Sequence, residues 1–282
     1  MSTANCTTVT PECPVSATTY AYVPNIGANS FFAALFGICG VYHIFIGIRS
    51  RGWTFMIALA LGALMEMVGY IGRILMHNNV WDSNAFRQQI VCLILAPSLI
   101  AAGIYWSLKH IVLYLGPEHS RLRPNLYPWI FIGCDIGSIF LQAAGGGVAS
   151  AGDDHPERVN TGNNIMIAGI AFQVATMGIC GILGLDFVWR VYKSRKAAGG
   201  EKPAVKDGSK FYLFCAAEVL AYVTVLIRCI YRLPEMAGGW GNELMQNELE
   251  FLILDGMMIA LAVVALSVCH PYWLCPSILK RA

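Results

Sequence analysis

The chain has 282 residues, of which 56% are hydrophobic and only 13% are charged, and its formal net charge is +2. Soluble domains carry about 25% charged residues, so the composition excludes an ordinary soluble protein and predicts one integral membrane domain. The small net charge says little about function, because the charged residues are distributed unevenly between the two sides of the membrane.

Seven stretches are apolar and long enough to cross a bilayer, which takes about 20 helical residues. In chain order they are roughly 29–48, 54–76, 88–108, 128–147, 164–189, 211–231 and 249–269. The fourth stretch is the weakest, since it contains Asp135, Gln142 and three consecutive glycines, 145–147. We interpret these glycines as a point of close helix approach or a hinge, and Pro97 predicts a kink in the third stretch. The predicted fold is an all-α polytopic membrane protein with seven transmembrane helices.

The basic residues predict the orientation, because cytoplasmic loops are enriched in Lys and Arg. With the N-terminus outside, 14 of the 19 basic residues lie on the cytoplasmic side and three lie outside. We therefore predict an extracellular tail over residues 1–28, a membrane domain over 29–270 and a cytoplasmic tail over 271–282. In the N-terminal tail, Asn5 begins an N-glycosylation pattern, and Cys6 and Cys13 are free to form a disulfide in an oxidising compartment.

Charged and amide side chains inside the predicted spans are the main functional signal. A charged group at the bilayer centre costs about 2.5–3.5 kcal/mol, so such groups are expected to face a packed or watery interior. The alternating span directions place Glu66, Asp135 and Glu218 near mid-membrane, where we expect them to line a shared cavity. The remaining polar candidates, nearer the middle or the outer half, are Arg73, Gln142, Gln173, Arg228 and Asp255.

Spacings of four and seven residues place the polar groups of a span on one helix face. The sets that show this spacing are Glu66 with Tyr70 and Arg73, Asp135 with Gln142, and Glu218 with Tyr222. We expect ion pairs that join Arg73 or Arg228 to Asp255 or Glu235. Two interpretations stay open for the arginines and Asp255: a structural network, or contacts to a ligand. Packing is the more typical role for the two tyrosines.

Several chemistries do not fit the sequence. A retinal protein needs a lysine in the bilayer, and the sixth and seventh spans contain none. The six histidines show no metal-ligand spacing, and there is no complete phosphate-binding loop. We therefore expect no cofactor, no metal and no enzymatic activity.

Motifs along most of the membrane domain carry a family resemblance. The second span contains Glu66-x-x-Gly69-Tyr70-x-x-Arg73, and the sixth ends in Arg228-x-x-Tyr231-Arg232-x-x-Glu235. Between and beyond them come Ala96-Pro97, Tyr105, Asp135, Gln142, Gly145-Gly146, Gly169, Gln173 and Asp255. In order and spacing, these residues resemble the fungal lipid-translocating exporters, also called RTA-like (resistance to aminocholesterol) proteins. The resemblance implies a seven-span protein that handles sphingoid long-chain bases, toxic amphiphiles or porphyrins.

The combined prediction is a plasma-membrane transporter that exports an amphipathic, lipid-like molecule and contributes to resistance. In this hypothesis Glu66, Asp135 and Glu218 attract a cationic headgroup. The expected partners are the amphiphilic cargo and membrane lipids, with no nucleic acid. The alternative is a seven-helix receptor or sensor, in which the same polar interior binds a lipid-like ligand without moving it.

Overall fold

The computed structural model describes residues 6, 9–151, 156–197, 208–239 and 241–275. In this part of the chain, seven helical segments are long and apolar enough to cross a membrane, which confirms the all-α, seven-span prediction. The first six are α1 (Ile26–Ser50), α2 (Trp53–Asn78), α3 (Ser83–Leu115), α4 (Leu126–Ser150), α5 (Pro156–Ala197) and α6 (Gly208–Ala237). The seventh comprises α7 (Glu248–Phe251), the π-helical turn η3 (Leu252–Met257), α8 (Met258–Val268) and α9 (Pro271–Leu274). Short 3-10 turns, η1 (Val15–Ala17) and η2 (Pro117–His119), lie outside the spans.

Local sequence signals explain several helix ends. Asn25 caps α1, and Asp82 caps α3 by accepting hydrogen bonds from the backbone N–H groups of Asn84 and Ala85. At the other end of α3, Gly116 adopts a φ of 122°, which a glycine tolerates well. The helices extend beyond the predicted spans, since hydropathy marks only the part in hydrocarbon. Helix α3 continues through Pro97, where the kink remains a prediction.

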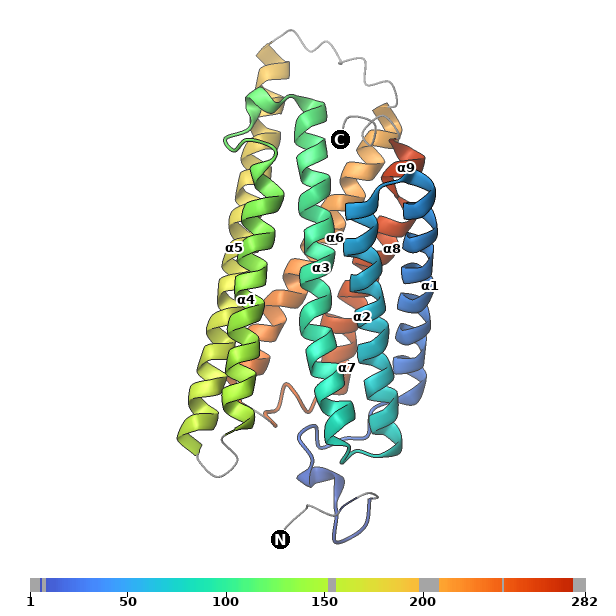
Figure 1. The fold of residues 1–282 in the computed structure, drawn as a ribbon, viewed down its shortest axis with the longest axis vertical. Coiled ribbons are helices and arrows are strands. Elements are labelled where there is room, and N and C mark those ends of the chain that lie inside the picture. The colour runs from blue at the N-terminus through green and yellow to red at the C-terminus, as the bar shows by residue number, and fades with distance from the viewer. Residues whose placement is uncertain (1–5, 7–8, 152–155, 198–207, 240, 276–282) are drawn as a thin grey trace.

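Helix α3 occupies the middle of the bundle. It packs against α2, α4, α5 and α6, while α1 pairs with α2, and α4 pairs with α5 (Figure 1). The seventh span packs against α6 and α1. The start of α1 and the short α9 lie at opposite ends of the bundle, as an odd number of spans requires (Figure 1). Which end faces the outside remains a prediction from the charge distribution, and so do the boundaries of the two tails.

The bundle exposes large apolar side chains on its surface and buries charged side chains within an otherwise apolar core. Trp129, Phe140 and Leu185 are more than 70% exposed, whereas Glu66 and Arg73 are completely buried. Large exposed apolar side chains distributed over long helices match a hydrocarbon solvent, in which backbone groups must be satisfied within each helix. The functional groups of this protein are therefore expected among its buried polar side chains.

The glycine run of α4 contributes to close packing against α5. A Cβ atom on Gly145 would lie 2.6 Å from the carbonyl oxygen of Gly162, which confirms close approach as its role. By contrast, a Cβ atom on Gly147 would meet no atom within 4 Å. The run therefore has one packed end and one open end.

We expect Gly162→Ala to destabilise the α4–α5 pair by about 1–3 kcal/mol, the usual cost of overpacking. Its Cβ atom would lie 2.4 Å from the backbone nitrogen of Ala149, and a backbone atom cannot rotate away. The measurement is thermal unfolding in detergent. The matched control is Gly178→Ala on the same helix, where an added Cβ atom meets nothing within 4 Å. Equal melting temperatures for the two variants would contradict the prediction.

Candidate functional site

Polar groups of four neighbouring helices meet α3 at successive levels along its axis. The pairs are Arg73 with Gln89, Glu66 with Cys92, Arg228 with the Leu93 carbonyl, Gln173 with Ser98, Asp135 with Tyr105, and Glu218 with Ser107. We call this set the α3 polar column. From Gln89 to Ser107 it extends over about 27 Å of helix, close to the hydrocarbon thickness of about 30 Å. The polar interior thus runs through nearly the whole bilayer rather than forming one buried point.

The first level of the column is the Arg73 cluster, made of Arg73, Asn29, Tyr22, Gln89 and Glu248. The Arg73 guanidinium donates from Nε to Asn29 Oδ1 at 2.9 Å and from Nη2 to Tyr22 Oη at 2.9 Å. A third donor, Nη1, reaches Gln89 Oε1 at 3.4 Å, and Nη2 lies 3.3 Å from Glu248 Oε1. One planar cation therefore joins α1, α2, α3, α7 and the N-terminal segment, as a fork of five donors permits.

The predicted partner of Arg73 was wrong. Its carboxylate partner is Glu248, which precedes Asp255 by seven residues and so lies about 10 Å nearer the start of the seventh span, level with Arg73. The other predicted partner, Glu235, pairs with Arg232 at 2.6 Å. Sequence spacing on one helix cannot fix the axial offset between two helices.

The N-terminal segment folds onto this end of the bundle through two tyrosines. Tyr22 accepts from Arg73, and the Tyr20 hydroxyl accepts a hydrogen bond from Gln89. Burial raises the pKa of both hydroxyls, against the opposing effect of the Arg73 charge. Both phenols therefore stay neutral, and the segment is held by hydrogen bonds.

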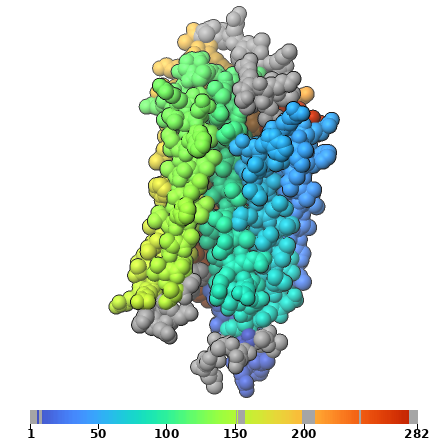
Figure 2. Space-filling model, in the orientation of Figure 1, coloured from blue at the N-terminus to red at the C-terminus, as the bar shows by residue number. Residues whose placement is uncertain are grey.

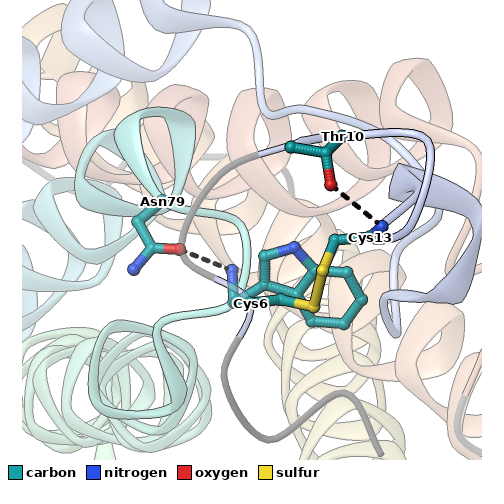
Figure 3. Close-up of a disulfide and its surroundings, with 5 residues drawn as sticks. Cys6, Thr10, Cys13 and Asn79 are labelled. Atoms are coloured by element: carbon teal, nitrogen blue, oxygen red, sulfur yellow. Dashed lines mark hydrogen bonds between the residues drawn. A yellow bond between two sulfur atoms is a disulfide. The ribbon is translucent and has the colours of Figure 1, made fainter. Parts of the chain in front are cut away.

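A disulfide joins Cys6 and Cys13 in the same segment, with their Cα atoms 6.0 Å apart (Figure 3). The sequence left this pairing open. Asn79, at the end of α2, lies beside Cys6 (Figure 3), which brings the bridge against the end of the bundle. The predicted glycosylation site, Asn5, lies outside the described residues.

An ion pair between Arg228 and Asp255 lies deeper in the bundle. Arg228 Nε is 2.8 Å from Asp255 Oδ1, and both residues are at least 97% buried, which confirms this predicted pair. Asp255 belongs to the π-helical turn η3, a local distortion that is frequent at functional sites. Next in the turn is Gly256, where a Cβ atom would lie 2.5 Å from the Tyr70 hydroxyl. Tyr70 therefore packs onto the turn, as expected of a packing residue.

Glu66 is the third charged group at this level. It is completely buried, and its carboxylate interacts electrostatically with Asp255 and Arg228. Neither carboxylate oxygen has a hydrogen-bond partner in the described part of the chain. Two acidic groups thus share one arginine, and Glu66 retains unused acceptor capacity.

The other two predicted acids lie apart from Glu66 on different helices. Asp135 of α4 is near the Tyr105 hydroxyl, and Glu218 of α6 is near Ser107. Both acids are at least 95% buried, and within the described residues no oxygen of either carboxylate forms a well-aligned hydrogen bond. All three acids face the interior, as the free-energy cost of a charge in the bilayer predicts, but they lie at separate levels of the α3 polar column.

An amide relay connects α4, α5 and α3 between those levels. Gln142 donates to Gln173 at 3.3 Å, and Gln173 donates to Ser98 at 2.7 Å. Tyr222 instead donates to the backbone carbonyl of Met177 at 2.6 Å, a contact that packs α6 on α5. The structure therefore brings the two predicted glutamines together and separates Tyr222 from them.

A groove of about 730 Å³ lies between α3, α4 and α5. Of the predicted site residues it is lined by Gln142 alone. A smaller cavity of about 150 Å³ lies under the N-terminal segment. Glu66, Asp135 and Glu218 line neither of them, so the shared cavity expected for the three acids is not one of these two. The helices pack closely around each acid, and the roles of these residues in binding remain predictions.

Several members of the site were not predicted as site residues, among them Asn29, Gln89, Ser98 and Glu248. Asn29 and Glu248 stand in the first turns of their spans, where polar residues are common. Amide and hydroxyl side chains such as Gln89 and Ser98 are also common in apolar spans, so their presence alone does not indicate a site. Only the contacts of the folded bundle reveal their roles.

Seven apolar helices around buried ion pairs and amides define a polytopic membrane protein with a polar interior. Among known protein families, the family model described as RTA1 like protein matches residues 59–278 of the chain. The chain belongs to this family.

Several yeast proteins are similar to the chain. Sphingoid long-chain base transporter RSB1 of Saccharomyces cerevisiae (strain Lalvin EC1118 / Prise de mousse) is 34% identical over 276 residues, which cover 88% of this chain and 72% of the relative. Protein RTA1 of Saccharomyces cerevisiae (strain ATCC 204508 / S288c) is 27% identical over 89% of this chain and 84% of its own length. Protoporphyrin uptake protein 1 of the same strain is 31% identical over 73% of this chain and 65% of its own length. No solved structure matches the chain.

Proposed function

We propose that the protein is a plasma-membrane transporter that moves a long-chain amphiphile from the cytosolic leaflet outward and thereby contributes to resistance. The α3 polar column carries the proposal, because a transported headgroup needs polar partners through the thickness of the bilayer. Membership of the RTA1 like family and the similarity to a sphingoid long-chain base transporter support this cargo class.

The cargo that fits best is a cationic amphiphile such as a protonated long-chain base. Glu66, Asp135 and Glu218 are buried carboxylates with free acceptor capacity, and each would stabilise an ammonium group in a water-poor interior. The headgroup steps along α3 from one carboxylate level to the next while the hydrocarbon chain stays in lipid. Ser98 and Gln173 offer polar contacts between the levels of Glu66 and Asp135.

Movement along this path requires the helices to separate, since all three acids are at least 95% buried. Proton binding and release at the carboxylates supplies a coupling step, as carboxylates do in pumps. A gradient-driven cycle then alternates between a packed state, such as the one described, and an open state that exposes one acid level to the cargo.

We expect Glu66→Gln, Asp135→Asn and Glu218→Gln each to reduce long-chain-base export about tenfold or more. Each substitution removes one charge-assisted contact, which is worth about 1.5–3 kcal/mol. The measurement is efflux of a labelled long-chain base from cells with matched amounts of each variant in the membrane. Glu243→Gln is the control, because Glu243 is exposed and lies outside the column. Normal efflux in all three variants would refute the carboxylate model.

Purified protein in vesicles separates a transporter from a receptor or sensor. A transporter changes the distribution of a fluorescent long-chain base between the two leaflets. Saturable binding without any redistribution, under an imposed proton gradient of either direction, would show that the protein is a receptor or sensor instead.

A further inference from the structure

The groove between α3 and α4 opens on the side of the bundle. Helices α4 and α5 diverge from α3 toward the end that carries the N-terminal segment (Figure 1), and the hollow appears in the lower half of Figure 2. Its walls are apolar, with Ile90, Ile94 and Leu95 on α3 facing Ile139 and Ala143 on α4. Because Ala143 is exposed and the neighbouring surface is apolar, the groove faces the surrounding lipid.

The dimensions of the groove match one hydrocarbon chain within one leaflet. Its lining runs along α3 from Ser83 to Leu95, about 18 Å of helix, compared with about 15 Å for half of the hydrocarbon core. A volume of about 730 Å³ lies in the range of about 300–1,000 Å³ that is typical of small-molecule sites. The groove therefore has the length and volume for a single chain that enters from the leaflet at the N-terminal end.

The two ends of the groove differ in chemistry. Arg87, Ser83 and Thr19 line the end near the N-terminal segment, and Gln142 lines the deep end. Arg87 is exposed and takes part in no ion pair within the described residues. An unpaired guanidinium beside two hydroxyl groups fits phosphate or carboxylate oxygens, to which it donates two parallel hydrogen bonds.

We propose that this groove binds one hydrocarbon chain of a membrane amphiphile with an anionic headgroup, whose phosphate or carboxylate meets Arg87. This goes beyond the proposed function, since the same cation would repel a cationic cargo. The occupant is a second ligand, an anionic lipid of the leaflet at the N-terminal end. The end of its hydrocarbon chain lies against Gln142, the first residue of the amide relay, so a bound lipid affects the packing of α4 and α5 around α3.

The test uses phosphatidylglycerol that carries a photoreactive diazirine at the end of one acyl chain, in vesicles containing the full-length protein. Light should attach the probe to the deep wall of the groove, near Leu95 and Ile139, as located by peptide mass spectrometry. Gly147→Leu is expected to fill part of the groove, because Gly147 lines it and an added Cβ atom there meets no protein atom within 4 Å. We expect this substitution to lower labelling of the deep wall at least fivefold.

Gly133→Leu is the matched control, since Gly133 lies on the same helix, is equally open and does not line the groove. Labelling that is equal in the wild-type protein and in Gly147→Leu would overturn the proposal. Labelling that falls equally in Gly133→Leu would also overturn it, because the effect would then be nonspecific.

The headgroup is tested separately. Arg87→Gln should weaken labelling by the phosphatidylglycerol probe and by a diazirine fatty acid, but not by a diazirine long-chain base. The control is Arg158→Gln, an exposed arginine that does not line the groove. If each of the three probes labels Arg87→Gln as strongly as the wild-type protein, the anionic headgroup is refuted. Inorganic phosphate that displaced the lipid probe would show that the arginine selects a free anion instead of a lipid, and would refute the lipid assignment.

The outcomes of these tests are independent of the transport test. Normal long-chain-base export in the three carboxylate variants would refute the carboxylate model, and binding without redistribution in vesicles would refute transport. Both results would leave groove labelling intact. Conversely, loss of the labelling difference between Gly147→Leu and Gly133→Leu would refute the lipid groove and leave the transport result unchanged.

Discussion

Replacing Arg228 with methionine is expected to lower the free energy of unfolding by about 3–5 kcal/mol, the usual effect of removing one partner from a buried ion pair. Arg228 lies 2.8 Å from Asp255, and neither residue has appreciable solvent exposure. It also donates to the Leu93 carbonyl of α3 and interacts with the buried carboxylate of Glu66. Its removal leaves two acids close together in a water-poor interior. The measurement is equilibrium unfolding in mixed micelles.

The double variant Arg228→Met/Asp255→Leu separates the ion pair from the packing. Removing both charges is commonly neutral or even stabilising, so the double variant should be more stable than Arg228→Met alone. Arg121→Met is the matched surface control, because the Arg121–Asp186 pair is exposed and solvent screening should leave it little effect on stability. If the double variant were as unstable as the single one, the loss would come from packing and the electrostatic account would be wrong.

Replacing Arg73 with glutamine is expected to release the N-terminal segment and to destabilise the bundle by about 3–5 kcal/mol. The guanidinium donates hydrogen bonds to Asn29 and Tyr22 and forms an ion pair with Glu248. It also lies 4.1 Å from the ring centroid of Phe251, a favourable cation–π distance. Glutamine is too short to keep these contacts. The expected readout is a lower melting temperature together with rapid proteolysis within residues 9–25, while the membrane core stays resistant.

Two further variants make this prediction specific. Arg73→Lys keeps the charge but loses the planar fork, so we expect an intermediate loss of stability. Arg49→Gln removes an exposed arginine near the end of α1 and should leave both stability and proteolysis unchanged. Protease resistance of the segment in Arg73→Gln would show that the tyrosines and the disulfide hold it without the arginine.

The interior of the bundle has to satisfy two opposite requirements. The α3 polar column must be polar enough to accept a headgroup, yet buried charges without partners destabilise a membrane bundle. The structure meets both requirements by pairing the buried Arg73 and Arg228 with carboxylates and leaving the oxygens of acids such as Glu66 and Asp135 without hydrogen bonds in the described part of the chain. Stability therefore depends mainly on the cations, while the acids are available for cargo.

The sequence by itself determined the membrane class, the seven spans and the burial of the charged groups. These properties follow from the length of apolar runs and from the cost of charge in hydrocarbon, and both act along a single helix. Glu66 and Asp135 could thus be placed inside the bundle without any contact being known. The Arg228–Asp255 pair was also within reach, as one of a few combinations at similar depth.

Only the tertiary structure decided which groups meet across helices. It paired Arg73 with Glu248, made α3 the central helix of the polar groups, and opened a groove where α4 diverges from α3. The physical reason is that the axial offset, rotation and tilt of each helix are set by the packing of all its neighbours. A hydropathy pattern of period 3.6 states which face turns inward, but it carries no information about what that face will touch.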